Sequence, residues 1–319
     1  MVRGEPPFLL LMAAAGLAAC SGDPVAEGAA PTFWLSQTGL YSDIRTKSLA
    51  ADLIGFEPTH ALWSDGVDKQ RWLRLPQEGR IDTSDTDHWQ FPIGAMLFKE
   101  FARGGRRLET RLISRTGQGP DDYFMGAFIW NDDESDARYV PGGARDVRGT
   151  EHDVPSTKQC VVCHDGEPGR ILGYSAVQQV AAPEAILSDP SVLSFRVPGD
   201  TVTARALGYL HANCGHCHAQ SGAAWPDTDL DLRLRTHDAL PEETASYRSS
   251  VGMTMSDAKS RQYRIVPGSA AESGVYHRMS ERGPIIQMPP LATEQVDTSG
   301  LEAIAAWISA LKPKPEQNQ

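Results

Sequence analysis

The sequence predicts a mixed α+β fold, with a β-rich antiparallel sheet or sandwich in the N-terminal part followed by a mostly helical region. Between residues 32 and 150, short segments rich in β-branched and aromatic residues alternate with turn clusters of Gly, Asp and Pro. After residue 200, apolar residues recur at helical spacing in two segments. A chain of 319 residues, 40% of them hydrophobic, is long enough for two domains or one large one.

The N-terminal residues indicate a leader followed by a tether. Residues 1–19 combine Arg3 with an apolar run of 12 residues at 8–19, which is too short for a membrane-spanning helix and typical of a secretory signal. The run ends in Leu-Ala-Ala before Cys20, which resembles a bacterial lipobox and implies that Cys20 is lipidated. An ordinary secretory signal with a chance cysteine is the alternative. Residues 20–31 suit a flexible tether, so we expect an exported, periplasmic protein anchored by lipid to the cell membrane or outer membrane.

Composition narrows the choice of partners. The net charge of −11 argues against nucleic acid or an anionic membrane surface as a partner. No stretch after the leader is long and apolar enough to span a membrane. These properties fit a periplasmic protein that meets a redox partner protein, including one with a basic surface.

Four segments of the 32–150 region are the predicted strands. They are QRWLRL at 70–75, AMLFKEFA at 95–102, RLETRLIS at 107–114 and FMGAFIWN at 124–131. Their spacing indicates an antiparallel sheet or a sandwich. The region shows no nucleophile triad, phosphate-binding loop or metal triad in its sequence.

Two acidic stretches have structural interpretations. NDDESD at 131–136 lacks the glycine of an EF-hand loop, so we interpret it as a polar hairpin turn, with Ca²⁺ binding as the alternative. DTDLDLRLR at 227–235 alternates polar and apolar residues and predicts a strand whose Asp side chains face water.

The cysteines form a repeated motif. There are five, and apart from Cys20 they fall into two groups, CVVCH at 160–164 and CGHCH at 214–218. Each is C-x-x-C followed at once by His, which is the attachment signal for a c-type haem. We call these the first and the second motif. Export agrees with this interpretation, because haem c is attached outside the cytoplasm.

Other uses of paired cysteines fit less well. A four-cysteine zinc site usually has a gap of about 15–20 residues, whereas 50 residues separate these pairs, and zinc would leave both trailing histidines unexplained. A thioredoxin-like site needs a βαβ context that the sequence lacks, and two C-x-x-C disulfides would close loops too small to stabilise the fold much. The motifs therefore predict two covalently attached haem c groups, each with an iron.

The residues of each motif have defined roles in haem attachment. Two thiols separated by two residues reach the two vinyl groups along one edge of the porphyrin, and the next residue brings an imidazole under the iron. The predicted attachment and ligand residues are Cys160, Cys163, His164, Cys214, Cys217 and His218. Among them, His164 and His218 bind the metal.

The 201–319 region begins and ends with a predicted helix. The first helix runs from a cap at Thr201 or Thr203 into the second motif. The last begins at a capping box, Ser299-x-x-Glu302. One apolar face follows from the spacing of Leu301, Ile304, Ile308 and Leu311.

This region resembles a class I cytochrome c domain, in which a first helix runs into the haem motif and a last helix packs across it. Gly208 and Tyr209 on the first helix and Trp307 on the last match the residues at that family's helix crossing. The resemblance implies that Met288, in the loop IIQMPPLAT at 285–293, is the distal iron ligand of the second haem. Its competitors are Met253, Met255 and Met279.

The segment 151–200 around the first motif is too short for a complete domain of that kind and contains no methionine. The distal ligand of the first haem is therefore missing or comes from elsewhere in the chain. Candidates are His88, His152, His211, Met96, Met125, Met253 and Met255. His216 is a spacer within the second motif, and we interpret both His216 and His211 as ordinary polar residues, with His211 also a candidate for the other haem.

Four stretches together, LWSDG, FPIGAMLFKEF, VPSTKQCVVCH and QMPPL, resemble a group of bacterial di-haem c-type cytochromes that are lipoproteins. The resemblance implies an architecture rather than a particular activity. The predicted organisation is a signal peptide at 1–19, a tether at 20–31, a β-rich domain at 32–150, the first haem-motif segment at 151–200 and a cytochrome c-like domain at 201–319.

These features predict an exported di-haem cytochrome that carries electrons between a periplasmic redox enzyme and a respiratory acceptor. One alternative is an enzyme, a di-haem peroxidase with one open haem site. Against it, the motifs are only 54 residues apart (160 to 214), and the β-rich region is foreign to that family. Another alternative makes the β-rich domain a substrate-binding module whose haem region is the electron outlet to a partner dehydrogenase.

Overall fold

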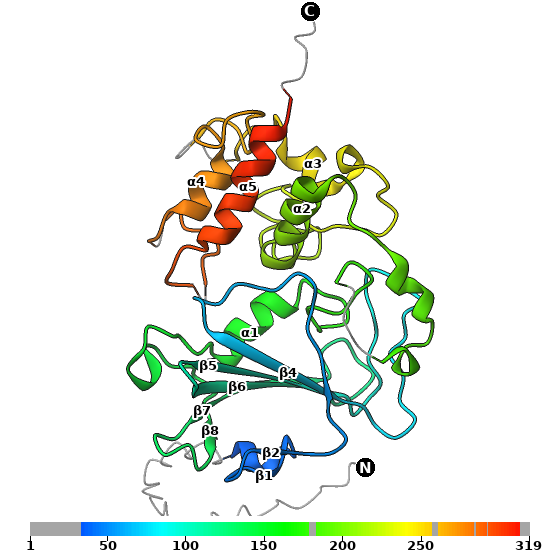
Figure 1. The fold of residues 1–319 in the computed structure, drawn as a ribbon, viewed down its shortest axis with the longest axis vertical. Coiled ribbons are helices and arrows are strands. Elements are labelled where there is room, and N and C mark those ends of the chain that lie inside the picture. The colour runs from blue at the N-terminus through cyan, green and yellow to red at the C-terminus, as the bar shows by residue number, and fades with distance from the viewer. Residues whose placement is uncertain (1–32, 179–182, 257–260, 284, 292, 313–319) are drawn as a thin grey trace, which may run out of the picture. The chain divides into compact units, whose positions relative to one another are not determined.

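The β-rich region is a six-stranded antiparallel sheet in which every strand pairs with its neighbours in sequence. The strands are β3 (Ile54–Gly55), β4 (Asp68–Arg74), β5 (Met96–Arg103), β6 (Arg106–Arg115), β7 (Tyr123–Trp130) and β8 (Ala137–Tyr139) (Figure 1). A separate ribbon pairs β1 (Tyr41–Asp43) with β2 (Ser48–Leu49). The four predicted strands correspond to β4–β7, and all four lie in the six-stranded sheet. Of the two predicted arrangements, the described residues therefore form the antiparallel sheet and not the sandwich.

The structure is a computed structural model that describes residues 33–178, 183–256, 261–283, 285–291 and 293–312. The predicted signal peptide, the tether and Cys20 lie outside these residues. Contacts divide the chain into residues 1–32 and residues 33–319, and every described element belongs to the second unit. Among the described residues, no helix combines the length and the apolar content that crossing a bilayer requires.

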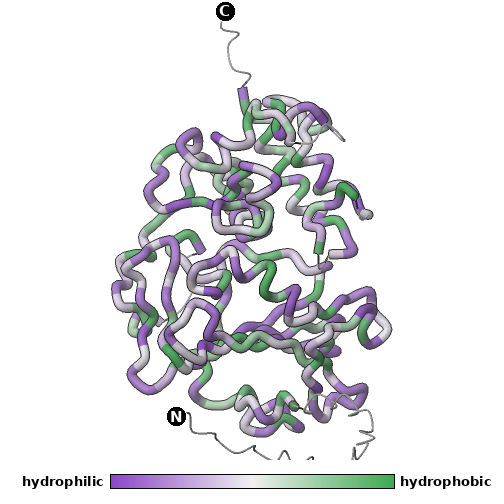
Figure 2. The backbone as a smooth tube through the Cα atoms, turned by 180° about the vertical axis from the view of Figure 1, so that it is seen from behind, coloured by the Kyte–Doolittle hydropathy of each residue, from purple (hydrophilic) through white to green (hydrophobic). Residues whose placement is uncertain are grey.

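Alternating side chains give the sheet two faces with different partners. One face packs against the chain around Leu35 and Leu40. Its core side chains from the sheet are Trp72, Phe98, Leu112, Phe128 and Trp130. Burying one side chain such as Phe98 stabilises the fold by about 1.5–3 kcal/mol. The interleaving of hydrophobic and hydrophilic residues along the chain is seen in Figure 2.

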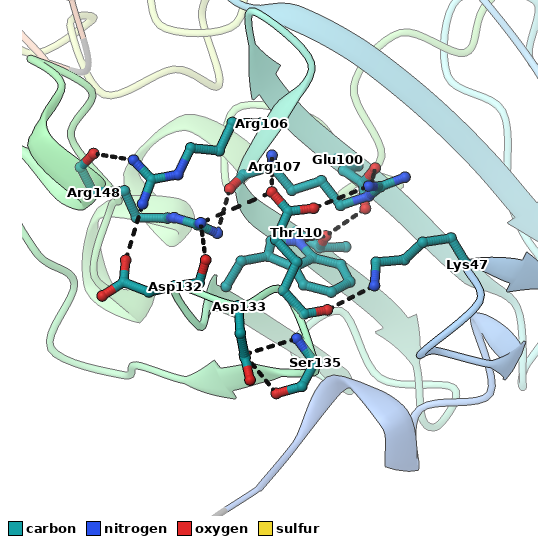
Figure 3. Close-up of polar contacts among 11 residues, drawn as sticks. Lys47, Glu100, Arg106, Arg107, Thr110, Asp132, Asp133, Ser135 and Arg148 are labelled. Carbon is teal, nitrogen blue, oxygen red and sulfur yellow. Dashed lines mark hydrogen bonds and ion pairs between the residues drawn. The ribbon is translucent and has the colours of Figure 1, made fainter.

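The acidic stretch NDDESD is the hairpin turn between β7 and β8, as predicted. Basic side chains of the protein hold its carboxylates, with Arg106 Nη2 2.9 Å from Asp132 and Arg107 Nη1 3.2 Å from Glu134 (Figure 3). Lys47 Nζ donates to the backbone carbonyl of Glu134 at 2.6 Å. Two of the four carboxylates of the turn, those of Asp132 and Glu134, therefore pair with cations of the fold itself.

Five α-helices lie among the described residues: α1 (Thr157–His164), α2 (Thr201–Asn213), α3 (Ala245–Ser250), α4 (Gly274–Ser280) and α5 (Thr298–Ala310). Five short 3-10 helices also lie among the described residues: η1 (Leu35–Gln37), η2 (Val147–Gly149), η3 (Glu184–Ile186), η4 (Pro190–Ser194) and η5 (Pro241–Glu243). Helices α2 and α5 pack side by side, whereas α1 lies against the sheet and contacts β7 (Figure 1). The core between α2 and α5 includes Leu207, Leu210, Ile304, Trp307 and Ile308. The molecule is therefore of the mixed α+β class.

The two long helices begin at different caps from those predicted. Asp200 caps α2, because its carboxylate accepts a hydrogen bond from the Thr203 backbone N–H at 2.8 Å. Asp297 caps α5 and accepts from the Gly300 backbone N–H at 2.9 Å. An N-cap oxygen must reach the amide two or three residues ahead, and in both helices an aspartate just upstream of the predicted cap does so.

The segment 227–235 is not the predicted strand. It pairs with no strand among the described residues. Leu232 and Leu234 are buried in the same apolar cluster as α2 and α5, while the Arg233 side chain between them is buried among polar groups. The alternation is present, but its apolar side packs against helices rather than within a sheet.

Candidate functional site

A cavity of about 780 Å³ lies where the sheet, α1, the C-terminal end of α2 and the loop around Met288 meet. Small-molecule and cofactor sites commonly measure about 300–1,000 Å³. All seven residues predicted from the sequence to hold haem line this cavity: Cys160, Cys163, His164, Cys214, Cys217, His218 and Met288. The tertiary structure thus brings both motifs and the predicted distal methionine to one space.

The first motif forms the second half of α1. The helix begins at a capping box in which Ser156 and Gln159 exchange side-chain and backbone hydrogen bonds. Cys160, Cys163 and His164 are spaced i, i+3 and i+4, which places them on one face of the helix. That face borders the cavity. Local helix geometry therefore presents both thiols and the imidazole in the same direction.

The imidazole of His164 has a defined tautomer. Its Nδ1 lies 2.7 Å from the carbonyl oxygen of Arg170, and because a carbonyl can only accept, Nδ1 carries the proton. The other nitrogen, Nε2, is left with its lone pair free. Burial lowers the pKa of His164 to about 4, so the ring is neutral at neutral pH. A neutral imidazole held by a backbone carbonyl is the usual form of a metal-ligating histidine.

The second motif follows α2 directly, with Cys214 as the C-cap residue. The His218 backbone N–H donates to the Cys214 carbonyl at 2.8 Å, which closes one turn around the motif. Burial lowers the pKa of His218 to about 4, and the Leu230 backbone only partly opposes this. Its Nδ1 is buried and feels the Leu230 backbone, although no hydrogen bond of normal geometry forms there. Both motif histidines are thus half-buried, neutral bases at the cavity wall.

The two motifs touch each other. The ligand atoms of Cys163, His216 and Cys217 all lie within 4.8 Å of one another. A hydrogen bond from Cys217, helped by His216, lowers the pKa of Cys163 to about 4, while the same contact raises the pKa of Cys217. The prediction that His216 is an ordinary polar spacer is therefore incomplete, because its ring contacts a thiol of the other motif.

Backbone packing holds the motifs in this contact. A side chain on Gly166 would overlap the carbonyl oxygen of His216, so only glycine allows the two segments to approach this closely. The Arg233 guanidinium joins both segments, donating to the Gly166 carbonyl at 2.9 Å and to the Gly215 carbonyl at 3.4 Å. It also pairs with the Glu167 carboxylate at 2.8 Å. The sequence analysis did not predict a role for Gly166 or Arg233. The available signals were a glycine two residues after His164 and a charged residue within an alternating apolar segment.

The predicted distal ligands of the first haem separate into two groups. His152, Met125 and Met255 line the cavity. His88, His211, Met96 and Met253 are not among the lining residues. His88 instead bonds the Glu167 carboxylate at 2.8 Å, and His211 Nδ1 accepts from the Leu234 backbone N–H at 3.2 Å. His152 is engaged as well, with Nε2 2.8 Å from Glu109.

The candidates for the distal ligand of the second haem divide similarly. Met288, Met279 and Met255 line the cavity, whereas Met253 is 41% exposed and does not. The Met288 backbone N–H donates to the Arg278 carbonyl at 2.9 Å, which ties its loop to α4. Met279 also belongs to the apolar core beside α5. The role of Met288 as the distal ligand stays a prediction.

The contact between α2 and α5 agrees only partly with the residues that carried the cytochrome resemblance. Trp307 is 1% exposed and packs in the same cluster as Tyr209. A side chain on Gly208, however, would meet His60 rather than α5. The close approach on α5 occurs at Gly300, which receives the Tyr209 ring.

Comparison of the chain with protein-family models, with curated proteins and with solved structures finds no match in any of the three. The chemistry of the site must therefore be argued from its own residues. They are four thiols, two half-buried neutral imidazoles and the Met288 loop, all of which line one cavity.

Proposed function

We propose that this protein is an exported di-haem c-type cytochrome that transfers electrons. The observation that carries the proposal is that both complete C-x-x-C-H motifs, far apart in sequence, line one cavity of cofactor size together with Met288. Two covalent haems would account for every cysteine and for the trailing histidine of both motifs. When bound, each haem iron accepts and releases one electron.

The residues fit this cofactor in their present arrangement. Cys160 and Cys163 would bond the first haem and Cys214 and Cys217 the second, through thioether bonds. The tautomer of His164 leaves Nε2 free for a metal bond, and the Arg170 carbonyl keeps the ring oriented. The apolar part of the cavity wall would exclude water from the irons, which favours outer-sphere electron transfer over reaction with solvent.

The proximity of the motifs has a consequence for electron flow. Because the Cys163 and Cys217 ligand atoms lie within 4.8 Å of each other, the attachment edges of the two haems would meet there. An electron arriving at one haem would then reach the other inside the protein. This favours a carrier with two closely linked redox centres.

The proposal extends to location and partners. The leader and Cys20 predict export and lipid anchoring, and a periplasmic redox protein would be the electron donor or acceptor. The electron-carrier role is favoured over the peroxidase alternative, because the two motifs are only 54 residues apart and the β-rich region is foreign to that family.

Haem content is the direct test. Protein produced with the cytochrome c attachment machinery should contain two covalent haems per chain in a pyridine haemochrome assay. Replacing Cys160 and Cys163 with alanine should leave one, and so should replacing Cys214 and Cys217. A value of zero or one haem in the wild-type protein would reject the proposal.

A second candidate function is favoured by the three-residue contact between the motifs. Cys163, His216 and Cys217 offer two sulfur ligands and one nitrogen ligand, a set that suits zinc or copper. This site would leave Cys160, Cys214 and both trailing histidines without a role. Stoichiometric zinc or copper in purified protein that carries no haem, lost on His216→Ala, would favour this candidate over the di-haem cytochrome.

A further inference from the structure

The wall of the cavity formed by the sheet carries a row of cations. Arg71 on β4, Lys99 on β5 and Arg111 on β6 lie directly opposite one another in the strand register. All three line the cavity. Because side chains at paired positions of neighbouring strands share a face, the row presents three basic groups to the same space. We call these residues the cationic row.

The cationic row has one carboxylate as a direct partner. Arg111 bonds Glu109 through Nε at 3.0 Å and Nη2 at 2.5 Å. Glu109 is fully buried and also bonds His152, at 2.8 Å. The acceptor capacity of this carboxylate is therefore largely used by two groups.

The other two members of the row have no such partner. Arg71 is 8% exposed and makes no side-chain hydrogen bond or ion pair with another described residue, although Glu57 attracts it from further away. Lys99 Nζ likewise pairs with no carboxylate among the described residues and lies 4.9 Å from the centre of the Phe101 ring. Burial, and then Arg111 and Arg71, lower the pKa of Lys99 well below its usual value.

Physical chemistry makes this arrangement costly without an anion. Removing a cation from water is unfavourable unless a counter-charge compensates, and this cost is largest for Arg71, the most buried of the three. Arginine cannot escape the cost by losing its proton, because its guanidinium stays charged in proteins. An anion placed in the cavity would offset the cost, and a guanidinium matches a carboxylate through two parallel hydrogen bonds.

We propose that Arg71, Lys99 and Arg111 form a carboxylate-binding site in the cavity wall. The identity of the bound carboxylate rests on the proposed function. Each haem carries two propionate carboxylates, and we assign a propionate of a haem in this cavity as the group that the cationic row binds. A soluble carboxylate that enters the cavity could bind in the same way, and the experiment distinguishes a haem propionate from such a free ligand.

The test uses the full-length protein and the double substitution Arg71→Met and Lys99→Met. Arg106→Met is the control. Arg106 is likewise a basic residue of the sheet, on β6, but it is exposed, pairs with Asp132 in the hairpin turn and does not line the cavity. Covalent attachment should keep two haems in each variant. Loss of two nearby cations should lower the reduction potential of one haem, since positive charge favours the ferrous state.

We expect the double variant to shift the reduction equilibrium of one haem at least tenfold, which is about 59 mV for one electron. Redox-difference infrared spectra should show a displaced propionate carboxylate band, with the control unchanged. Arg71→Met alone serves as the second variant if the double variant folds poorly, and Arg71→Lys, which keeps the charge, should preserve most of both signals. Normal haem content with unchanged potentials and unchanged bands would overturn the haem-propionate assignment.

The remaining outcomes concern the soluble source and the site itself. If the cationic row binds a free carboxylate, succinate should raise the unfolding temperature of the wild type but not of the double variant. The same measurement can be made on haem-free protein. Absence of haem with a succinate effect would reject the proposed function and keep the site. Absence of both the haem signals and the succinate effect would overturn the site as well.

Discussion

Met288 is the residue predicted to complete the coordination of the second haem iron. In the proposed cytochrome its thioether binds the second iron, which gives a weak charge-transfer band at the red end of the ferric spectrum. We expect Met288→Ala to abolish that band, to lower the potential of one haem and to open that iron to CO. Met253→Ala is the control, because Met253 is exposed and does not line the cavity.

One outcome would contradict this assignment, and a second, which concerns the first haem, would favour the peroxidase alternative. Persistence of the band in Met288→Ala and its loss in Met279→Ala would move the ligand role to Met279, which also lines the cavity. Ready binding of CO by wild-type protein, together with turnover of peroxide by a reduced donor, would favour the peroxidase alternative.

Gly166 shows how the absence of one side chain can determine the contact between distant segments. A methyl group there would overlap the His216 carbonyl oxygen, which is backbone and cannot rotate away. We expect Gly166→Ala to lower the free energy of unfolding by about 1–3 kcal/mol, the usual cost of overpacking. Denaturant unfolding measures the effect. Gly55→Ala is the control, since a methyl group at Gly55 meets nothing within 4 Å, and equal stability of the two variants would refute the packing argument.

At the scale of one element, the start of α5 offers a test of the observed cap. Asp297 accepts from the Gly300 backbone N–H, and burial together with the charge of Asp297 raises the pKa of Tyr209. Asp297→Ala should cost about 0.5–2 kcal/mol of unfolding free energy, as expected for loss of an N-cap. Ser299→Ala, at the position that the sequence pattern favoured, should change stability much less. Thermal and denaturant unfolding of the two variants decides between the caps, and a larger effect of Ser299→Ala would show that the helix begins later.

At the scale of the whole molecule, the contact between the motifs predicts coupling between the haems. Haems attached at Cys163 and Cys217 would lie close enough for their Soret transitions to interact. We expect a two-signed Soret band in circular dichroism, and a potential for each haem that depends on the oxidation state of the other. The Cys214→Ala and Cys217→Ala double variant, with one haem, should lose the two-signed band. A wild-type spectrum equal to the sum of two separate haems would contradict the coupling.

A second prediction at this scale concerns pH, because His88, Glu167 and Arg233 join three distant parts of the chain. The hydrogen bond to Glu167 raises the pKa of His88 above its usual 6.5, against the opposing effect of burial. The folded state thus favours protonated His88. Its contribution to stability is complete below pH 6.5 and is lost as the pH rises through the raised pKa.

The measurement is the free energy of unfolding of wild type and His88→Gln across pH 5 to 9. The difference between the two proteins should be larger at the acidic end and should shrink as the pH rises. A difference that is constant over this range would mean that His88 acts without a change of charge.

The amino-acid sequence alone determined the local features of this protein. The strands β4–β7 follow from short-range alternation, and the two C-x-x-C-H motifs contain their chemistry within five residues each. Local patterns did not determine which residue caps α5. Asp297 and Ser299 are both good N-cap residues, and the conformation of the backbone decides that Asp297 is the cap. The alternation at 227–235 was also ambiguous, since an apolar side can pack on helices as well as in a sheet.

Only the tertiary structure decided that both motifs share one cavity, that Cys163 meets Cys217, and that Gly166 and Arg233 hold this contact. It also decided that the cationic row faces the motifs. In sequence, Arg71, Lys99 and Arg111 are ordinary polar positions of three strands, and nothing local shows which face of the sheet is covered. The physical reason is separation along the chain. A motif within one helical turn can be recognised from neighbouring residues alone, whereas contacts between residues tens of positions apart depend on how the sheet and helices pack.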